Sequence, residues 1–255
     1  MLLRIVLAVA ALSGVARAQQ PVAPAPLPPA LAIVADSTLQ PFERPNGTLL
    51  RPGTTIFDLS TRRDTQLVSL GIRTVQVVES SLAGTPAWLI VESRTGSAVE
   101  TSDSLYLTRA ELSPERWVAT SGRARLGASF TQDTLFGALQ SYQGRSSFTT
   151  ILGAGALVTP GMVEHVVELL PLHAGYRAAV SLVRIELGTP RAIPGELSVE
   201  RDETLTLGDR TIDCWVVALR AGASEERLWV AKEMPRVVKT EQAFPGGMLT
   251  AIARP

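Results

Sequence analysis

Residues 159–171, which read TPGMVEHVVELLP, form the one stretch whose hydrophobic spacing clearly departs from simple alternation. Apolar side chains recur in it at i, i+3, i+4 and i+7, the spacing that places them on one face of an α-helix. These positions are Val163, Val166, Val167 and Leu170. The stretch therefore predicts a helix with a single apolar face.

Both ends of this helix carry suitable residues. Thr159 can cap the N-terminus, and Pro160 fits the first helical position because no backbone N–H is needed there. Pro171 cannot continue the helix. We therefore expect a helix near residues 160–170.

Most of the remaining chain alternates apolar and polar residues with a period near two, and glycine turns separate the alternating segments. A single helix among many strands must bury its apolar face against the sheet, which is the only large partner available. The sequence thus predicts a mainly β (α+β) fold: a curved antiparallel β-meander or half-barrel wrapped around one central α-helix.

The two halves of the chain share a weak pattern of a turn, a tryptophan strand, a strand with a central aromatic residue and an acid-apolar-proline turn. The first unit runs through Trp88, Tyr106 and Pro114, and the second runs through Trp215, Trp229 and Pro235. Two explanations are open: an internal duplication, or the same hairpin chemistry in both halves.

The N-terminus has the features of a secretory signal in residues 1–18. Arg4 precedes a short apolar core, and Ala16-Arg17-Ala18 matches a small-x-small cleavage pattern. We expect cleavage near Ala18, which would make Gln19 the first mature residue, and export to the periplasm or the medium. The proline-rich residues 19–50 are predicted to be a flexible linker, and residues 51–255 a single β-rich domain.

Composition narrows the class of protein. The 255 residues are 45% hydrophobic, enough for a real core, and carry 24 basic and 24 acidic side chains. The absence of a basic excess argues against a nucleic-acid partner. No later segment has 18 consecutive apolar residues, so no transmembrane segment is expected in the mature chain. The single cysteine, Cys214, alternates with Ile212 and Val216 and is predicted to be a buried apolar side chain.

The only cluster that suggests a mechanism is Glu164, His165 and Glu168. It lacks the His-Glu-x-x-His order of zinc hydrolases, and His173 lies beyond a proline. The simpler interpretation places Glu164 and Glu168 on the solvated side of the helix and His165 at the edge of its apolar stripe. We therefore predict no catalytic residue, no metal ligand and no cofactor, and a hydrolase stays the lesser alternative.

Aromatic side chains offer a candidate ligand cavity. Trp88, Trp215 and Trp229, together with the helix residues Val163, Val166, Val167 and Leu170, can form its apolar wall. The alternative is that these tryptophans, with Trp117, are simply core residues.

Short motifs around the helix and at the chain end resemble a known family. The passage LLPLHAGY at residues 169–176 is similar to one in the exported bacterial proteins of domain-of-unknown-function family 3108. LWVAKE at 228–233, Val237-Val238-Lys239 and Pro245-Gly246-Gly247 resemble the ending of that family. The resemblance covers roughly residues 51–255. It implies a curved antiparallel sheet around a helix, similar to the outer-membrane lipoprotein carriers, and it carries over no catalytic residue.

These patterns lead to one hypothesis and two alternatives. The sequence favours an exported, non-enzymatic envelope protein that binds or carries an apolar ligand, a lipid or an acyl chain. A structural or adaptor protein of the envelope with a packed core is the alternative from another class, and a hydrolase is the third. Side chains that fill the space between helix and sheet would favour the adaptor.

Overall fold

The computed structural model describes residues 39–63, 66–96, 100–153, 155–159, 161–186, 189–244 and 247–254. The predicted signal sequence, the cleavage site before Gln19, the first part of the predicted linker and Pro160 lie outside these residues. All the described residues belong to one compact unit, Asp36–Pro255.

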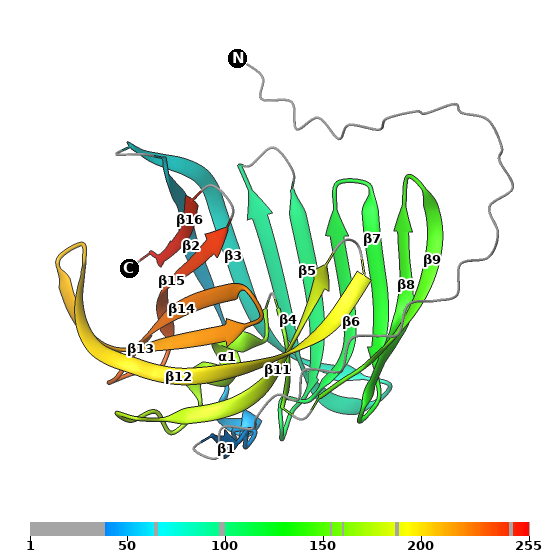
Figure 1. Cartoon of the computed structure of the whole chain (residues 1–255), viewed down its shortest axis with the longest axis horizontal. Helices are drawn as coiled ribbons and strands as arrows, with labels where there is room; N and C mark the ends of the chain where they lie inside the picture. Colours follow the sequence, from blue (N-terminus) through cyan, green and yellow to red (C-terminus); the bar gives the residue numbers. More distant parts are fainter. Residues whose placement is uncertain are drawn as a thin grey trace, which may run out of the picture. The chain divides into compact units, whose positions relative to one another are not determined.

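The described part of the chain forms a 16-stranded sheet that curves without closing (Figure 1). The first half contains β1 (Gln40–Pro41), the 3-10 helix η1 (Gly47–Leu49), β2 (Gly53–Arg63), β3 (Gln66–Leu82), β4 (Thr85–Thr95), β5 (Thr101–Thr108), β6 (Pro114–Ser121), β7 (Ala124–Phe130), β8 (Thr134–Ser141) and β9 (Gly144–Ile151). The second half contains β10 (Ala156–Val158), α1 (Val163–Glu168), β11 (Arg177–Glu186), β12 (Thr189–Leu207), β13 (Arg210–Ala221), β14 (Ser224–Ala231), β15 (Val237–Phe244) and β16 (Gly247–Ala253).

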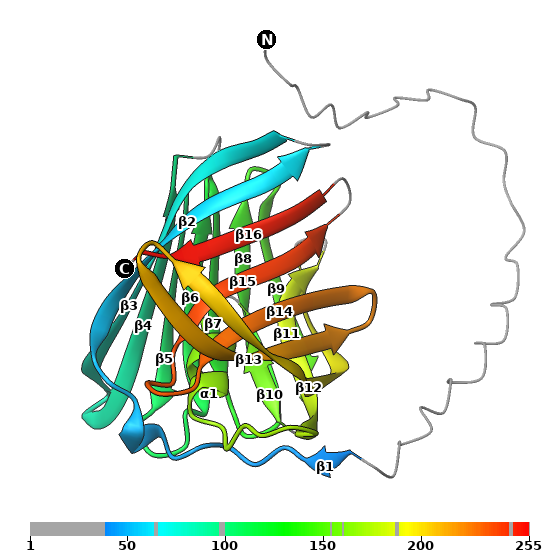
Figure 2. The same ribbon diagram turned by 90° about the vertical axis from the view of Figure 1, so that its left-hand side faces the viewer.

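Two antiparallel meanders make up the sheet, as the alternating pattern predicted. One runs from β2 to β9 and the other from β11 to β16, and they join where β16 pairs with β2. The short strands β1 and β10 both pair in parallel with β11. Figures 1 and 2 show how the sheet curls so that both meanders border one interior.

The helix α1 lies inside this curve, against β14 and β15 (Figure 1). It is shorter than predicted. The N–H of Thr159 still bonds Val183 in the β10–β11 ladder at 2.9 Å, so Thr159 is not the N-cap; that position belongs to Met162, whose side chain makes no capping bond. Gly161, at φ +97°, provides the turn between ladder and helix.

The main core fills the interior, and the apolar face of the helix belongs to it as predicted. Val163, Val166, Val167 and Leu170 are at most 7% exposed. Around them lie inward-facing residues of both meanders, so the helix is enclosed rather than laid on a surface. An enclosed helix has no solvated side, which bears directly on its charged residues.

A second, smaller apolar cluster lies on the other face of the sheet. It contains Cys214, Val216, Trp229, Ala231 and Val238. Cys214 is free and fully buried, which confirms the prediction of an apolar role, and burial raises the pKa of its thiol to about 11.

A bulge in β12 divides this long strand between the two clusters. The pairing with β13 shifts between Val199 and Arg201, so Glu200 is an extra residue. Leu197 and Val199 therefore pack in the main core, whereas Leu205 and Leu207 pack against the second cluster. The four leucine and valine positions share one parity in the sequence but not one face in the fold.

The two meanders repeat one side-chain arrangement. In the first, Trp88 lies opposite Glu79, and the Arg109 guanidinium stacks on the indole and pairs with Glu79 at 2.7 Å. In the second, Trp215 lies opposite Asp202, and Lys232 stacks on the indole 3.9 Å from its centre and lies 3.5 Å from Asp202.

Strand register agrees with this correspondence. The β5–β6 pairing shifts immediately after Tyr106, and the β14–β15 pairing shifts immediately after Trp229. Shared register and shared side-chain contacts favour an internal duplication over coincident hairpin chemistry.

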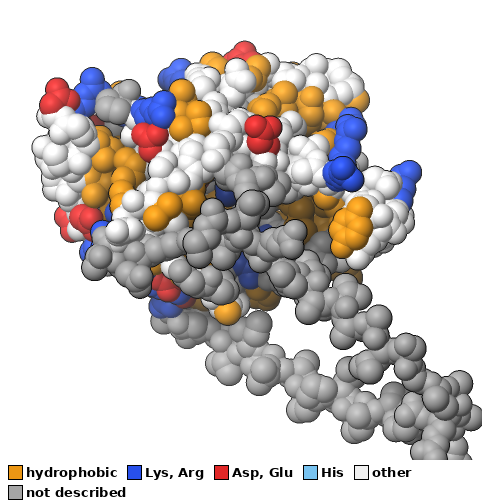
Figure 3. All heavy atoms as spheres, turned by 90° about the horizontal axis from the view of Figure 1, so that it is seen from above, with side chains coloured by type: hydrophobic (Ala, Val, Ile, Leu, Met, Phe, Trp, Pro, Cys, Tyr) orange, Lys and Arg blue, Asp and Glu red, His pale blue; other side chains and the backbone are white. Residues whose placement is uncertain are grey.

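Ordered packing begins before the predicted end of the linker at residue 50. Arg44 donates hydrogen bonds to the carbonyls of Leu112 and Ala156, Trp88 donates to the Gly47 carbonyl, and Leu50 is buried. Across the part of the chain described, no helix has the length and apolar character needed to cross a membrane. Seen from above, side chains of both charges are scattered among apolar groups (Figure 3).

Candidate functional site

A buried group of ion pairs occupies the centre of the interior. Arg73 on β3 binds Glu164 of α1 with both terminal nitrogens, at 2.5 and 2.8 Å, and also binds Glu92 of β4 at 2.7 Å. All three residues are at most 5% exposed. Glu92 in turn accepts a hydrogen bond from Nε of Arg94 at 2.9 Å. The ion network is thus an alternating chain of four charges, Glu164–Arg73–Glu92–Arg94.

Strand alternation places these charges inside. Arg73 shares its face of β3 with the buried Val75 and Val77, and Glu92 shares its face of β4 with Trp88 and Ile90. A bulge lies at Leu70, just before Arg73, where the β2–β3 pairing shifts. Charged residues on the buried parity of two strands were the sequence signal for this network, and the sequence-based predictions did not include it.

The ion pairs hold each other in the charged state. Burial opposes the charge on Arg73, but attraction to Glu164 and Glu92 outweighs it and keeps the pKa of Arg73 well above its ordinary value. Burial likewise disfavours ionised Glu92, yet Arg73 and Arg94 bring its pKa below the usual range. The four groups act as a neutral, internally compensated set.

The prediction that Glu164 and Glu168 reach solvent is wrong for Glu164, and Glu168 is largely covered. Because the sheet surrounds the helix, Glu164 is 5% exposed and points at Arg73. Glu168 accepts a hydrogen bond from the Val237 N–H at 2.7 Å and lies 3.1 Å from Nδ1 of His165. Neither carboxylate belongs to a solvated helix face.

His165 is buried within the fold rather than at a stripe edge. Burial would lower its pKa, but the hydrogen bond to Glu168 and the charges of Glu168 and Glu164 raise it. Its other ring nitrogen, Nε2, is buried without a partner among the described residues. Glu168 contacts both His165 and the Val237 N–H, whereas Glu164 is bound to Arg73. The three residues proposed for a hydrolase are therefore divided between two sets of partners.

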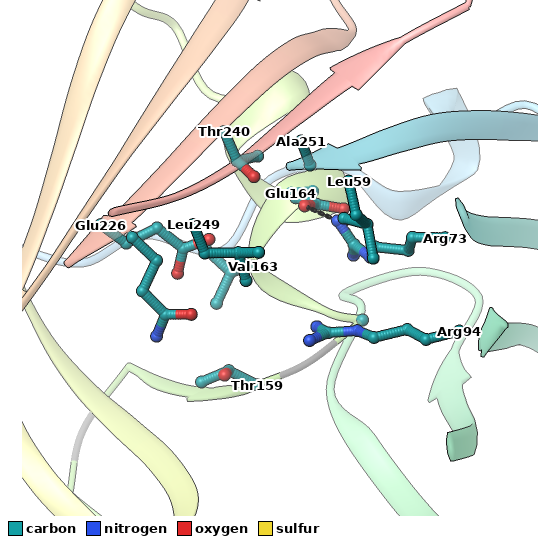
Figure 4. Close-up of a pocket in the computed structure, with 12 residues that line it drawn as sticks. Leu59, Arg73, Arg94, Thr159, Val163, Glu164, Glu226, Thr240, Leu249 and Ala251 are labelled. Atoms are coloured by element: carbon teal, nitrogen blue, oxygen red, sulfur yellow. Dashed lines mark hydrogen bonds and ion pairs between the residues drawn. The ribbon is translucent and has the colours of Figure 1, made fainter. Parts of the chain in front are cut away.

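An inner cavity of about 40 Å³ adjoins the ion network (Figure 4). Strands of both meanders, the helix and the turn before it supply its wall: Leu59, Arg73, Arg94, Thr159, Gly161, Val163, Glu164, Glu226, Thr240, Gln242, Leu249 and Ala251. Arg94 reaches into it from one side and Glu226 from the opposite side. Such a volume has room for a few water-sized groups.

Glu226 is the acid of this cavity that the ion network does not neutralise. It lies on β14 opposite Gln242 of β15, on the same face as the buried Leu228 and Val230. Its carboxylate forms no hydrogen bond or ion pair within the described parts of the chain. Burial, reinforced by the negative charge of Glu164, raises its pKa to about 7.

A wider cavity of about 360 Å³ shares part of its wall with the inner one. Arg94, Thr159 and Gln242 line both, so they mark the junction. The rest of its wall consists of Thr101, Asp103, Trp117, Ala119, Thr120, Ser121, Ala124, Leu126, Leu139, Arg184 and Ile185.

Asp103 is the acid of the wider cavity. It accepts a hydrogen bond from the Trp117 indole N–H at 3.1 Å, and burial raises its pKa to about 6. The chain therefore presents a small cavity with several charged groups next to a larger one, whose apolar wall comes mainly from β6, β7 and β8.

The predicted ligand-wall residues are not gathered around one cavity. Val163 lines the inner cavity, while Val166, Val167 and Leu170 pack in the main core. Trp88 is 1% exposed and packs there too, with its indole N–H on Gly47.

The remaining two predicted tryptophans lie on opposite faces of the sheet. Trp215 packs against the main core, whereas Trp229 belongs to the second cluster and is covered by Lys239, 4.0 Å from its ring centre. The tryptophan at the wider cavity is Trp117, which the predicted ligand wall of Trp88, Trp215 and Trp229 did not include.

The described residues show no group of three or more histidine, cysteine, aspartate or glutamate side chains placed to hold a metal ion. Comparison with known proteins adds no relative: no family model, curated protein or solved structure matches the chain. The resemblance to family 3108 and to the lipoprotein carriers therefore stays a prediction.

Proposed function

We propose that this protein is a non-enzymatic binding protein or carrier for an amphipathic ligand, a lipid or a molecule with an acyl chain, held inside the curved sheet. One observation carries the proposal: an inner cavity lined by charged side chains and a wider cavity with a largely apolar wall share the junction residues Arg94, Thr159 and Gln242. A ligand with a polar end and an apolar body matches these two neighbouring cavities, with the polar end in the inner one and the apolar body in the wider one. The wider cavity also has the volume typical of small-molecule sites.

The position of the cavity changes the kind of ligand expected. A purely apolar ligand packed on the helix finds no room there, because the apolar face of α1 is already buried in the core. The ligand proposed here lies beside the helix and turns its polar end toward Arg94 and Glu226. Export through the predicted signal sequence, which would place such a carrier in the cell envelope, is part of the proposal.

A structural or adaptor protein is the second candidate, and the close packing of α1 favours it. Val166 and Val167 are fully buried, so the sheet and helix are stable as a packed body without any ligand. In that case water would fill both cavities.

Cavity-filling variants distinguish these functions. Ala119 lines the wider cavity and faces Leu126 across the β6–β7 pair, so Ala119→Trp should fill the space without breaking an ion pair. Leu67→Trp is the matched control, because Leu67 is 70% exposed on β3. Binding of a fluorescent acyl probe to the purified full chain is measured by titration, and folding by circular dichroism.

For a carrier, the wild type and Leu67→Trp bind the probe saturably, whereas Ala119→Trp binds at least about tenfold more weakly. Native mass spectrometry of protein from cells should then also reveal a co-purifying amphiphile. Wild-type protein that neither saturates with probe nor carries such a molecule would reject the carrier and leave the adaptor.

A further inference from the structure

The charged residues of the inner cavity indicate which kind of polar group the ligand would carry. The ion network Glu164–Arg73–Glu92–Arg94 contains two acids and two bases and is balanced by itself. Glu226 adds one acid that this network does not bind. A cationic group at Glu226 would complete the charge balance of the chamber.

Arg94, in contrast to Glu226, has a positive charge that calls for an anionic partner. Among the described residues it hydrogen-bonds only through Nε, to Glu92, and its guanidinium extends into the cavity across from Glu226 (Figure 4). Its side chain is 33% exposed, and it lines both cavities. Terminal guanidinium N–H groups bind carboxylate or phosphate oxygens strongly. An anionic group at the junction would therefore find a partner in Arg94.

We infer that the ligand is a zwitterionic amphiphile with a terminal primary ammonium, which enters the inner cavity beside Glu226, while an adjacent anionic group meets Arg94 and the apolar tail occupies the wider cavity. This inference rests on the proposed carrier function. The order ammonium, anion, tail follows the order of the walls: Glu226 in the inner cavity, Arg94 at the junction, then Trp117 and Leu126 beyond.

The remaining polar groups suit a primary ammonium. Such a group has three N–H donors. Glu226 can accept one, and the Thr240 hydroxyl and the Gln242 amide oxygen lie in the same wall to accept others. A quaternary ammonium has no N–H donor and would leave these acceptors unsatisfied. The volume of about 40 Å³ also favours the smaller group.

Headgroup selectivity tests the inference. Lysophospholipids with one common tail and an ethanolamine, a choline or a glycerol headgroup are titrated into the full chain below their critical micelle concentrations, with calorimetry as the readout. Wild-type protein should bind the ethanolamine form at least about tenfold more tightly than the other two. Glu226→Gln should lose this preference while still binding all three.

Glu225→Gln is the matched control. Glu225 neighbours Glu226 on β14 but points to the opposite face, where it pairs with Arg220 and Arg227. This variant should keep the ethanolamine preference. Circular dichroism confirms that both variants fold.

Each remaining outcome overturns a specific claim. Equal affinity for all three headgroups, or an unchanged preference in Glu226→Gln, rejects the ammonium site and leaves the carrier function intact. Tightest binding of the anionic glycerol form means that Arg94 alone recognises the headgroup, which also rejects it. Failure of every lysophospholipid and of the acyl probe to bind rejects the proposed function itself.

Discussion

Arg73 shows what a single charged residue contributes to this fold. Its guanidinium is shared between Glu164 and Glu92 in the buried interior, so each carboxylate depends on it. Buried ion pairs give little net stability compared with apolar packing, but removal of one partner leaves an uncompensated charge. The network therefore acts mainly as a constraint that fixes α1 to β3 and β4.

Glu164→Gln should lower the free energy of unfolding by about 3 kcal/mol, because it leaves part of the Arg73 charge unpaired in the interior. Glu79→Gln is the control: Glu79 pairs with Arg109 at the surface and is 53% exposed, so its loss should cost less than about 1 kcal/mol. Urea unfolding followed by tryptophan fluorescence measures both. Equal losses in the two variants would contradict a structural role for the buried pair.

Glu226 should make stability depend on pH. Its folded-state pKa of about 7 lies above the ordinary 4.5, because burial and Glu164 disfavour the charge more than Arg73 and Arg94 favour it, while Glu92 adds to the disfavour. The stability gained from protonated Glu226 is fully present below about pH 4.5 and is lost as the pH rises through about 7.

Glu226→Gln mimics the protonated side chain at every pH. We expect it to match the wild type in unfolding free energy near pH 4 and to exceed it by about 3 kcal/mol at pH 8. Thermal melts across this range, without ligand, provide the measurement. A difference of the same size at both pH values would show that Glu226 does not titrate as described.

Much of this site was readable in the sequence from strand parity. Arg73, Glu92 and Glu226 each share a strand face with a buried apolar residue two positions away, and a charge in such a position signals a buried partner. These apolar residues are Val75, Ile90 and Leu228. The pairing of Glu164 with Arg73 was not readable, because α1 meets β3 and β4 only through the curvature of the whole sheet. Glu164 was misplaced for the same reason: local amphipathicity assumes a solvated side.

Among the elements, β3 depends on a glycine at its bulge. Gly71 has φ +106°, and a Cβ there would lie 2.0 Å from the carbonyl oxygen of Thr95. The chain needs both the positive φ and the close approach of β4, and only glycine permits them. Because the bulge lies just before Arg73, it places the Arg73 side chain on the inner face of the sheet.

Gly71→Ala should therefore destabilise the protein by about 3 kcal/mol, through backbone strain and a direct clash. Gly53→Ala at the start of β2 is the control, since a Cβ there meets no atom within 4 Å. That variant should stay within about 0.5 kcal/mol of the wild type. Chemical denaturation compares them, and a harmless Gly71→Ala would mean that the bulge relaxes freely.

The strand β12 shows which structural features the sequence pattern predicts and which it does not. The apolar alternation around Leu197 and Leu205 is typical of strands, and both residues lie in the single long strand β12. The extra residue Glu200 reverses the faces halfway, and a bulge leaves no mark in residue type when both faces are partly buried. Strand existence was predictable here, while its register was not.

At the scale of the described unit, the pairing of β16 with β2 joins the two meanders. Sequence neighbours form nearly all other strand pairs, so local patterns predicted the meanders well. This long-range pair could not be predicted, because nothing local distinguishes β16 from an edge strand. Without it, the interior that contains the ion network would lose one wall.

A chain that ends after Phe244 lacks β16 and exposes the edges of β2 and β15. We expect it to unfold in a broad or two-step transition with a lower midpoint, because the meanders are no longer coupled through the sheet. Removal of Pro255 alone is the control and should leave one sharp transition. Scanning calorimetry measures both chains, and a wild-type profile for the shorter one would show that the core alone couples the halves.

The unclosed edge of the sheet has a mechanical consequence. β9 pairs only with β8 in the part described, and its other side meets β12 through the Thr150 hydroxyl, which donates to the Pro190 carbonyl at 2.8 Å. The strands next to this β9–β12 contact, β8 beside β9 and β11 beside β12, both border the wider cavity. The enclosure can therefore widen if the sheet bends and the contact between β9 and β12, with its hydrogen bond from Thr150 to Pro190, separates. The hydrogen bonds of the strand ladders need not break. A wider ligand would then enter through a change in the curvature of the sheet, without local unfolding of any strand.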